Sequence, residues 1–156
     1  MATIVAETGS GSATANSYVT AAELATYAAD RNVTVTATAA VLLIKAMDYI
    51  ESKSFIGGKM TSIQALQWPR YGVRVDGYYV ASDSIPTLLK EAQMEISLGI
   101  DGGDNPLAKQ ERLTKKEKVG PLEVEYASSS RASTYLTAGE TKLRKLTTQS
   151  IVLLRV

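Results

Sequence analysis

The sequence contains no cysteine and no histidine. Without cysteine the chain has no disulfide, no thiolate nucleophile and no cysteine-rich zinc site, which fits a reducing compartment. Without histidine it lacks the commonest general base near neutral pH and the commonest metal ligand. Ser-His-Asp catalysis, Cys-His catalysis and histidine-ligated zinc are therefore excluded. No paired motif indicates a carboxylate or lysine mechanism instead, so we expect a protein that is not an enzyme and uses no cofactor.

Long apolar segments are also missing. The densest runs, 39–44 and 151–154, are far shorter than the ~20 residues of a membrane helix. The first residues carry no basic group ahead of an apolar block, so they do not resemble a signal peptide. We therefore expect a soluble chain with no membrane partner that is made in the cytosol.

Helical periodicity dominates the first hundred residues. Thr20 and Glu23 fit a capping box, which predicts a helix over residues 20–31. Residues 39–53 carry apolar side chains at helical spacing around a wide face and predict the strongest helix of the chain. The polar side chains of this segment, Asp48, Glu51 and Lys53, are expected to face water.

Two further helices are predicted. Ser84 as N-cap and Pro86 in the first turn favour a helix whose Glu91 and Glu95 point outward and which ends at residues 101–106. A short helix over 62–67 is expected to stop where a proline follows Trp68, because a residue before proline avoids the α conformation.

Strand signals are few and short. Residues 2–7 alternate weakly between apolar and polar side chains and predict a short strand. Asp76-Gly77 is a turn signal between 71–75 and 78–81, which predicts a small hairpin. A second ribbon is predicted from 113–119 and 122–126, which flank Gly120-Pro121.

Together these elements predict a mainly α protein. It is a small helical bundle with a short N-terminal strand, a β-hairpin arm over about 109–127 and an extended or helical C-terminal tail. Within this single domain we expect a helical body over 1–106, the arm over 107–127, and a linker and docking tail over 128–156.

Charge is unevenly distributed. Residues 1–105 hold 7 basic and 11 acidic side chains (net −4), whereas residues 106–156 hold 10 and 5 (net +5). The arm carries a basic cluster that would either hold DNA in a channel without reading its sequence or contact a neighbouring subunit or the tail, and we favour the subunit or tail contact. A solvated basic hairpin is the simpler alternative. The cluster comprises Lys109, Arg112, Lys115, Lys116 and Lys118.

The sequence around the only tryptophan predicts a structural role. Trp68 has Tyr71, Tyr78 and Tyr79 nearby in the sequence, which favours a core position over an interface anchor. Pro69 fixes the direction in which the chain continues. Arg70 is expected to hold a carboxylate or backbone carbonyls through its planar fork and so to fix the loop 71–83.

A stacking platform for single-stranded nucleic acid is not evident. Aromatic residues are scattered, and only Tyr126 and Tyr135 lie near the basic segment in the sequence. The C-terminal tail is expected instead to dock on a partner, either by adding a strand to a sheet edge or by binding in a groove. The alternative is that it folds onto the core of its own subunit. The docking residues are Lys142, Arg144, Lys145, Ile151, Val152, Leu153 and Leu154.

Several short motifs, in their order and spacing, resemble a family of tailed-bacteriophage structural proteins. The first is Ile4–Gly9 followed by Ala15–Glu23; the others are Ala46–Glu51, Gln64–Arg70, Ser84–Pro86 and Glu117–Tyr126. Members look like head–tail connector, or head-completion adaptor, proteins and are often labelled DnaT-like single-stranded-DNA-binding proteins. The resemblance covers about residues 3–127, and the tail departs from it most.

The resemblance implies a virion structural protein at the head–tail junction, present in the host cytoplasm during assembly. It would form a ring, with twelve copies expected, which joins the portal protein to the tail or a tail-completion protein. DNA would pass non-specifically through the ring. The DNA-binding label implies an alternative, a phage single-stranded-DNA-binding protein of replication.

Overall fold

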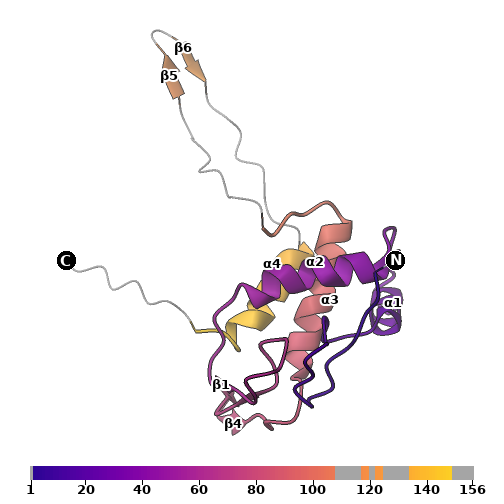
Figure 1. Ribbon diagram of the computed structural model, residues 1–156. Helices are drawn as coiled ribbons and strands as arrows, with labels where there is room; N and C mark the ends of the chain where they lie inside the picture. The colour runs from indigo at the N-terminus through magenta and orange to yellow at the C-terminus, as the bar shows by residue number, and fades with distance from the viewer. Residues whose placement is uncertain (1, 108–116, 120–121, 125–133, 149–156) are drawn as a thin grey trace, which may run out of the picture.

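The computed structural model describes residues 2–107, 117–119, 122–124 and 134–148. Their helices are α1 (Ala21–Ala29), α2 (Ala39–Glu51), α3 (Thr87–Asp101) and α4 (Thr134–Arg144) (Figure 1). The strands form three antiparallel pairs: β1 (Gly58–Lys59) with β2 (Arg70–Tyr71), β3 (Arg74–Val75) with β4 (Tyr78–Tyr79), and β5 (Glu117–Val119) with β6 (Leu122–Val124). The mainly α prediction is confirmed.

Helix α3 is the centre of the packing, and α1, α2 and α4 all contact it (Figure 1). Its residues Leu89, Ala92 and Ile96 are buried in one apolar cluster with α2 and α4, while Met94 and Leu98 join a second cluster with α1. Because α3 is covered on several sides, it buries polar residues as well, including Gln93 and Ser97. Gln93 accepts a hydrogen bond from the Tyr18 amide (2.9 Å) and donates to Ser17 Oγ (2.8 Å).

The predicted capping box is present at α1. The Thr20 hydroxyl accepts from the Glu23 amide (3.2 Å), and Glu23 Oε2 accepts from the Thr20 amide (2.6 Å). Helix α3, however, begins two residues later than predicted. Its N-cap is Pro86 rather than Ser84, whose hydroxyl donates to the Ala81 carbonyl within the preceding turn (2.9 Å).

Two other predicted elements are wrong. Residues 62–67 form bends rather than a helix, because the Gln64 side chain accepts a hydrogen bond from Thr61 and donates to Leu66 and Pro69, and the Ala65 amide donates to Ser12. Residues 2–7 contribute only one bridge, between Ala6 and Ser17, instead of a strand. The Glu7 carboxylate turns inward there and accepts from the amides of residues 9, 11 and 12, which orders the Gly/Ser-rich loop.

Two glutamates predicted to face water are turned into the molecule. Glu95 is buried and accepts a hydrogen bond from the Tyr27 hydroxyl (2.6 Å). Glu51 accepts from the Tyr18 hydroxyl (2.6 Å) and from the Gln67 amide (2.9 Å). Both carboxylates therefore connect elements that are distant in the sequence.

The C-terminal segment joins the body instead of leaving it at residue 106. Leu143 and Leu146 are buried in the main cluster, and Gly139 lets α4 approach α3 closely, since a Cβ there would lie 2.7 Å from Ile96 Cγ1. The Thr148 amide also donates to the Ser54 carbonyl (2.8 Å). Residues 134–148 thus complete the helical bundle, while the rest of the expected linker and tail lies outside the described residues.

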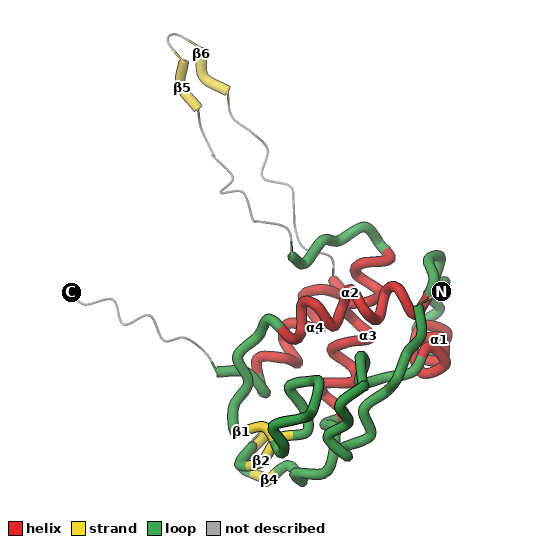
Figure 2. The backbone as a smooth tube through the Cα atoms, in the orientation of Figure 1, coloured by secondary structure: helices red, strands yellow, loops and turns green. Residues whose placement is uncertain are grey.

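A lobe with two strand pairs precedes α3 in the chain. Residues 55–83 hold β1–β2 and β3–β4, and Figure 2 shows β1, β2 and β4 together at the end of the body where α3 begins. The opposite end of α3 leads into the loop 102–107. The molecule therefore has two distinct ends, which are separated by the length of its central helix.

Candidate nucleic-acid interface

Within the predicted arm, the described residues pair as the antiparallel strands β5 and β6. Lys118 opposes Glu123 and Val119 opposes Leu122. The β5–β6 pair contacts no other element among those described. Lys118 lies in β5, whereas Lys109, Arg112, Lys115 and Lys116 lie outside the described residues.

One lysine predicted to dock a partner is used inside the body. Lys142 Nζ lies 2.9 Å from Glu91 Oε2, 3.5 Å from Glu95 Oε1 and 3.2 Å from the Tyr27 hydroxyl. Burial alone would lower the pKa of Lys142, but the hydrogen bonds to Glu91 and Tyr27 outweigh it and raise the pKa. Lys142 therefore joins α4 to α1 and α3.

The other docking residues are divided. Arg144 and Lys145 are exposed, and Lys145 Nζ forms an exposed ion pair with Asp76 Oδ2 at 3.1 Å. Ile151, Val152, Leu153 and Leu154 lie outside the described residues. Arg144 is therefore the exposed docking candidate for which no ion pair is described.

Trp68, Pro69 and Arg70 fix the lobe to the helices. Trp68 has no exposed surface and meets Phe55 edge to face at 6.2 Å, and the peptide bond between Trp68 and Pro69 is cis. Arg70 donates to the carbonyls of Phe55, Ile56 and Gly57. Burial lowers the pKa of Arg70 from its ordinary value. The fork holds backbone carbonyls, one of the two expected modes, in the segment 55–57 rather than in the loop 71–83.

A polar network reinforces this attachment. The Tyr18 hydroxyl accepts from the Trp68 amide (3.2 Å) while it donates to Glu51. Burial, and next to it the Glu51 carboxylate, raise the pKa of Tyr18 well above its ordinary value. Burial also raises the pKa of Glu51, despite its hydrogen bonds. The N-terminal loop, α2 and the lobe are thus held in one arrangement.

Three tyrosines of the lobe, which lie near the buried Trp68 in the sequence, are exposed to solvent. The exposed fractions are 57% for Tyr71, 81% for Tyr78 and 71% for Tyr79. The Arg74 guanidinium lies over the Tyr79 ring at 4.0 Å from its centroid. We call Tyr71, Arg74, Tyr78 and Tyr79 the tyrosine surface.

The backbone explains why these rings stay outside. Val73 is fully buried, and Val75 and Val80 pack against the same core, so the lobe buries its aliphatic side chains. The turn needs positive φ at Asp76 (51°) and Gly77 (88°), which a short Asp-Gly hairpin supplies. The tyrosine rings are therefore left exposed, with Tyr79 opposite Arg74 and Tyr78 opposite Val75 in the strand pairing.

The ring of Tyr71 occupies space above Gly58. A Cβ at residue 58 would lie 2.6 Å from Tyr71 Cζ, so any larger residue there would displace the ring. Lys59 follows directly and is exposed. The lobe thus presents exposed aromatic rings, of which Tyr79 lies against Arg74, and the exposed cation Lys59.

Sequence analysis missed this site because it ranked aromatic residues by their proximity to the basic segment. The signal that could have located it is Tyr78-Tyr79 directly after a predicted Asp-Gly turn. Side chains in so short a hairpin cannot all reach a core that Val73 and Val75 already enter. The contact between Tyr79 and Arg74 depends on the fold.

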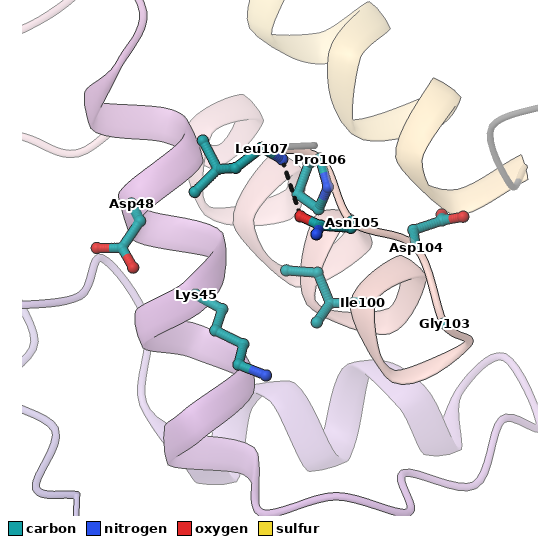
Figure 3. A pocket seen from close by; sticks show the side chains of 8 residues that line it. All are labelled: Lys45, Asp48, Ile100, Gly103, Asp104, Asn105, Pro106 and Leu107. Carbon is teal, nitrogen blue, oxygen red and sulfur yellow. Dashed lines mark hydrogen bonds between the residues drawn. The ribbon is translucent and has the colours of Figure 1, made fainter. Parts of the chain in front are cut away.

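A cavity lies at the other end of α3, between α2 and the loop 102–107 (Figure 3). Its volume is about 360 Å³. Ile100, Pro106 and Leu107 give it apolar walls, and Lys45 and Asp48 of α2 stand at its side. Within the described part of the chain, no group of three or more acidic residues is placed to hold a metal ion.

Comparison with known proteins identifies the family. The family model described as "Putative DnaT-like ssDNA binding protein" matches residues 2–156, so the chain belongs to this family. No curated protein and no solved structure matches the chain. None of the helices in the described ranges has the length and hydropathy of a membrane-spanning helix. The match confirms the DnaT-like part of the resemblance, and the head–tail adaptor role stays a prediction.

Proposed function

We propose, from this family membership, that the protein binds single-stranded DNA without reading its sequence and without catalysing a reaction. The observation that carries the proposal is the tyrosine surface, which has three exposed rings with Arg74 over one of them, in a lobe that also exposes Lys59. Unpaired bases stack on exposed aromatic rings, and nearby cations attract the phosphates. The family description supports the same ligand.

Stacking explains a preference for single strands. Each base offers a π-face whatever its identity, so tyrosine rings bind many sequences with similar strength. In a duplex these faces are covered by neighbouring base pairs and are not available. Arg74 already covers one face of Tyr79, which leaves the opposite face for a base and keeps a positive charge beside it.

The proposal is tested by fluorescence anisotropy with labelled oligothymidine and an unlabelled duplex of equal length as competitor. Stacking contributes about 1–3 kcal/mol per base, so Tyr78→Ala or Tyr79→Ala should weaken binding about 5- to 150-fold. Tyr78→Phe and Tyr79→Phe are the matched controls, and they should bind nearly as tightly as the unmodified protein because the ring is kept.

Salt titration adds an independent measurement. Affinity should fall as salt rises, and Arg74→Gln should make the slope shallower by about 0.7, the contribution of one phosphate contact to a single strand. A protein with no salt-dependent affinity for the oligonucleotide would refute the proposal. Alanine variants that bind like the unmodified protein would refute its placement at the tyrosine surface.

A head–tail adaptor is the second candidate, and one specific observation favours it. The β5–β6 hairpin contacts no other described element, as expected of an arm that lies on a neighbouring subunit. In that function a ring, with twelve copies expected, would join portal and tail in the virion, having assembled in the host cytoplasm. The basic arm residues would line its DNA channel or contact the next subunit.

Electron microscopy of the purified protein, alone and with its neighbouring particle components, tests the adaptor. Rings or decorated particles are expected. Deleting 151–156 should leave thermal unfolding unchanged but prevent attachment to the partner. A truncated protein that still joins heads to tails would refute the docking role of that segment.

A further inference from the structure

We infer that Lys145, directly after α4, binds a DNA phosphate beside Tyr78 and is a second cation of the DNA site. The inference rests on the proposed binding of single-stranded DNA and extends that site from the lobe to the end of α4. It starts from the ion pair between Lys145 Nζ and Asp76 Oδ2, which lie 3.1 Å apart. Asp76 belongs to the turn of the β3–β4 hairpin, two residues before Tyr78.

The two faces of the β3–β4 hairpin each carry one tyrosine. In the strand register Tyr78 pairs with Val75, and Tyr79 pairs with Arg74. Directly opposed residues of an antiparallel pair project from the same face, whereas successive residues project from opposite faces. The Tyr79 face therefore carries Arg74, whose guanidinium lies over the ring, and the Tyr78 face is the one that carries Val75.

The Tyr78 face is directed toward the segment that contains Lys145. Val75 packs against the apolar cluster that includes Leu143 and Leu146, two buried residues that flank Lys145 in the sequence. Lys145 thus approaches the hairpin from the side on which Tyr78 lies. Its ion pair holds the ammonium group at the turn next to that ring.

The backbone at Lys145 is anchored by the residue that follows it. The Leu146 carbonyl accepts a hydrogen bond from the Ile56 amide (3.1 Å), and the Leu146 side chain is fully buried. Two residues further on, the Thr148 amide donates to the Ser54 carbonyl (2.8 Å). A cation on an anchored backbone loses less conformational entropy when it binds a ligand than a cation on a free segment.

The ion pair lies in water, where a phosphate can reach it. The side chains of Lys145 and Asp76 are 51% and 70% exposed, and such exposed pairs add little to stability. In the free protein the Asp76 carboxylate occupies Lys145 and keeps a negative charge beside the proposed stacking site. A phosphate that binds Lys145 competes with this carboxylate, so Asp76 lowers the affinity for DNA.

Charge variants of the pair test the contact by fluorescence anisotropy with labelled oligothymidine. Lys145→Gln should weaken binding about two- to fivefold, the contribution of one exposed charge pair, and Asp76→Asn should strengthen it by a similar factor. Asp76→Asn keeps the turn, since asparagine also adopts the positive φ that this position requires before Gly77. The double variant should bind nearly like the unmodified protein, because one charge of each sign is removed.

Lys45→Gln and Asp48→Asn are the matched controls for net charge. Both side chains are exposed on α2 and stand beside the cavity at the opposite end of α3. They should leave DNA affinity nearly unchanged, because salt screens exposed charges beyond about 8 Å at physiological ionic strength. Lys145→Gln should in addition make the salt slope of binding shallower by about 0.7, the contribution of one phosphate contact.

The absence of cysteine allows a direct measurement of proximity. Lys145→Cys and Lys45→Cys are each mixed with oligothymidine that carries a bromoacetamide group on one backbone phosphorothioate. The cysteine thiolate displaces bromide and forms a thioether. Lys145→Cys should react several-fold faster than Lys45→Cys, and excess unlabelled oligothymidine should remove the difference.

Several outcomes would overturn the role of Lys145. They are unchanged binding by Lys145→Gln, no gain from Asp76→Asn, an equal loss from Lys45→Gln, or equal reaction rates of the two cysteine variants. If Tyr78→Ala still weakens binding in that case, the tyrosine surface remains the DNA site and only the contact with Lys145 is wrong. An unmodified protein that binds no oligonucleotide refutes the proposed function together with this inference.

Discussion

Lys142 and Lys145 lie one helical turn apart, and the structure predicts that removing their charges has unequal consequences. Lys142 contacts Glu91, Glu95 and Tyr27, and the exposed fractions of the Lys142 and Glu95 side chains are 23% and 9%. Lys145 meets only Asp76 in the ion pairs described, and these side chains are 51% and 70% exposed. The extent of burial therefore decides how much stability each substitution removes.

The magnitude follows from the two limits for ion pairs. Removing one partner of a fully buried pair costs about 3–5 kcal/mol, whereas an exposed pair contributes about 0–1 kcal/mol. Because Lys142 retains some exposure, we expect Lys142→Met to lower the free energy of unfolding by about 2 kcal/mol. For a chain of this length that corresponds to a fall in Tm of about 4–8 °C. Lys145→Met should cost less than about 0.5 kcal/mol.

Thermal and urea unfolding of both variants measures the difference, and methionine is used because it keeps the apolar stem of the lysine packed. Adding Glu95→Gln to Lys142→Met should recover part of the lost free energy of unfolding. The neutral amide side chain can still accept the hydrogen bond from Tyr27, and no unpaired charge is left at that position. Equal effects at the two lysines would refute the assignment of Lys142 to the body and would return it to the docking surface.

Three further predictions concern the fold. Trp68→Ala should lower the free energy of unfolding by about 3–5 kcal/mol, measured by urea denaturation, and a change near zero would mean that the ring is not core. Gly139→Val should cost about 2 kcal/mol because its side chain would meet Ile96, whereas Gly102→Val, at the C-cap of α3, is the looser comparison site. Burial would raise the pKa of Glu7, but hydrogen bonds from Gly9, Ser12 and Gly11 lower it overall. The ionised form is thus favoured by folding, so stability is lost as pH falls through the folded-state pKa, and Glu7→Gln should flatten that loss in unfolding curves taken from neutral to acid pH.

The sequence predicts elements whose signals are local. Thr20 and Glu23 specify the start of α1, apolar spacing specifies α2, and Asp76-Gly77 specifies the β3–β4 turn, because each depends on residues within one or two turns of chain. The short helix expected over 62–67 does not form, because contacts with other parts of the fold override the local signal there. Its polar side chain at Gln64 finds backbone partners in the folded protein that no local pattern reveals.

Long-range pairings could not be predicted. Glu95 looks solvent-facing on an isolated α3, and only the arrival of Tyr27 and Lys142 from other helices makes its burial acceptable. A similar argument applies to α4, whose polar sequence suggested a linker and tail. The buried part of this segment consists of Leu143 and Leu146, and the missing side chain at Gly139 lets α3 come close. Three such positions are too few to predict a buried helix from the sequence without its partner helix.

Charged side chains that have partners within the body maintain the fold, whereas exposed side chains of the lobe are available to a ligand. In the body, Glu95, Asp101 and Lys142 have partners from other parts of the chain, and Glu7 is held by the amides of the adjacent loop, so their loss should register first as instability. On the lobe, Arg74 contacts a tyrosine ring and Lys59 is exposed, while Tyr78 and Tyr79 expose most of their surface. Exposed aromatic rings contribute little to folding, since their surface stays in water in both states. Their exposure on a support fixed by Trp68 and Arg70 fits the proposed binding of DNA, and variants of the two groups should separate cleanly in unfolding and binding assays.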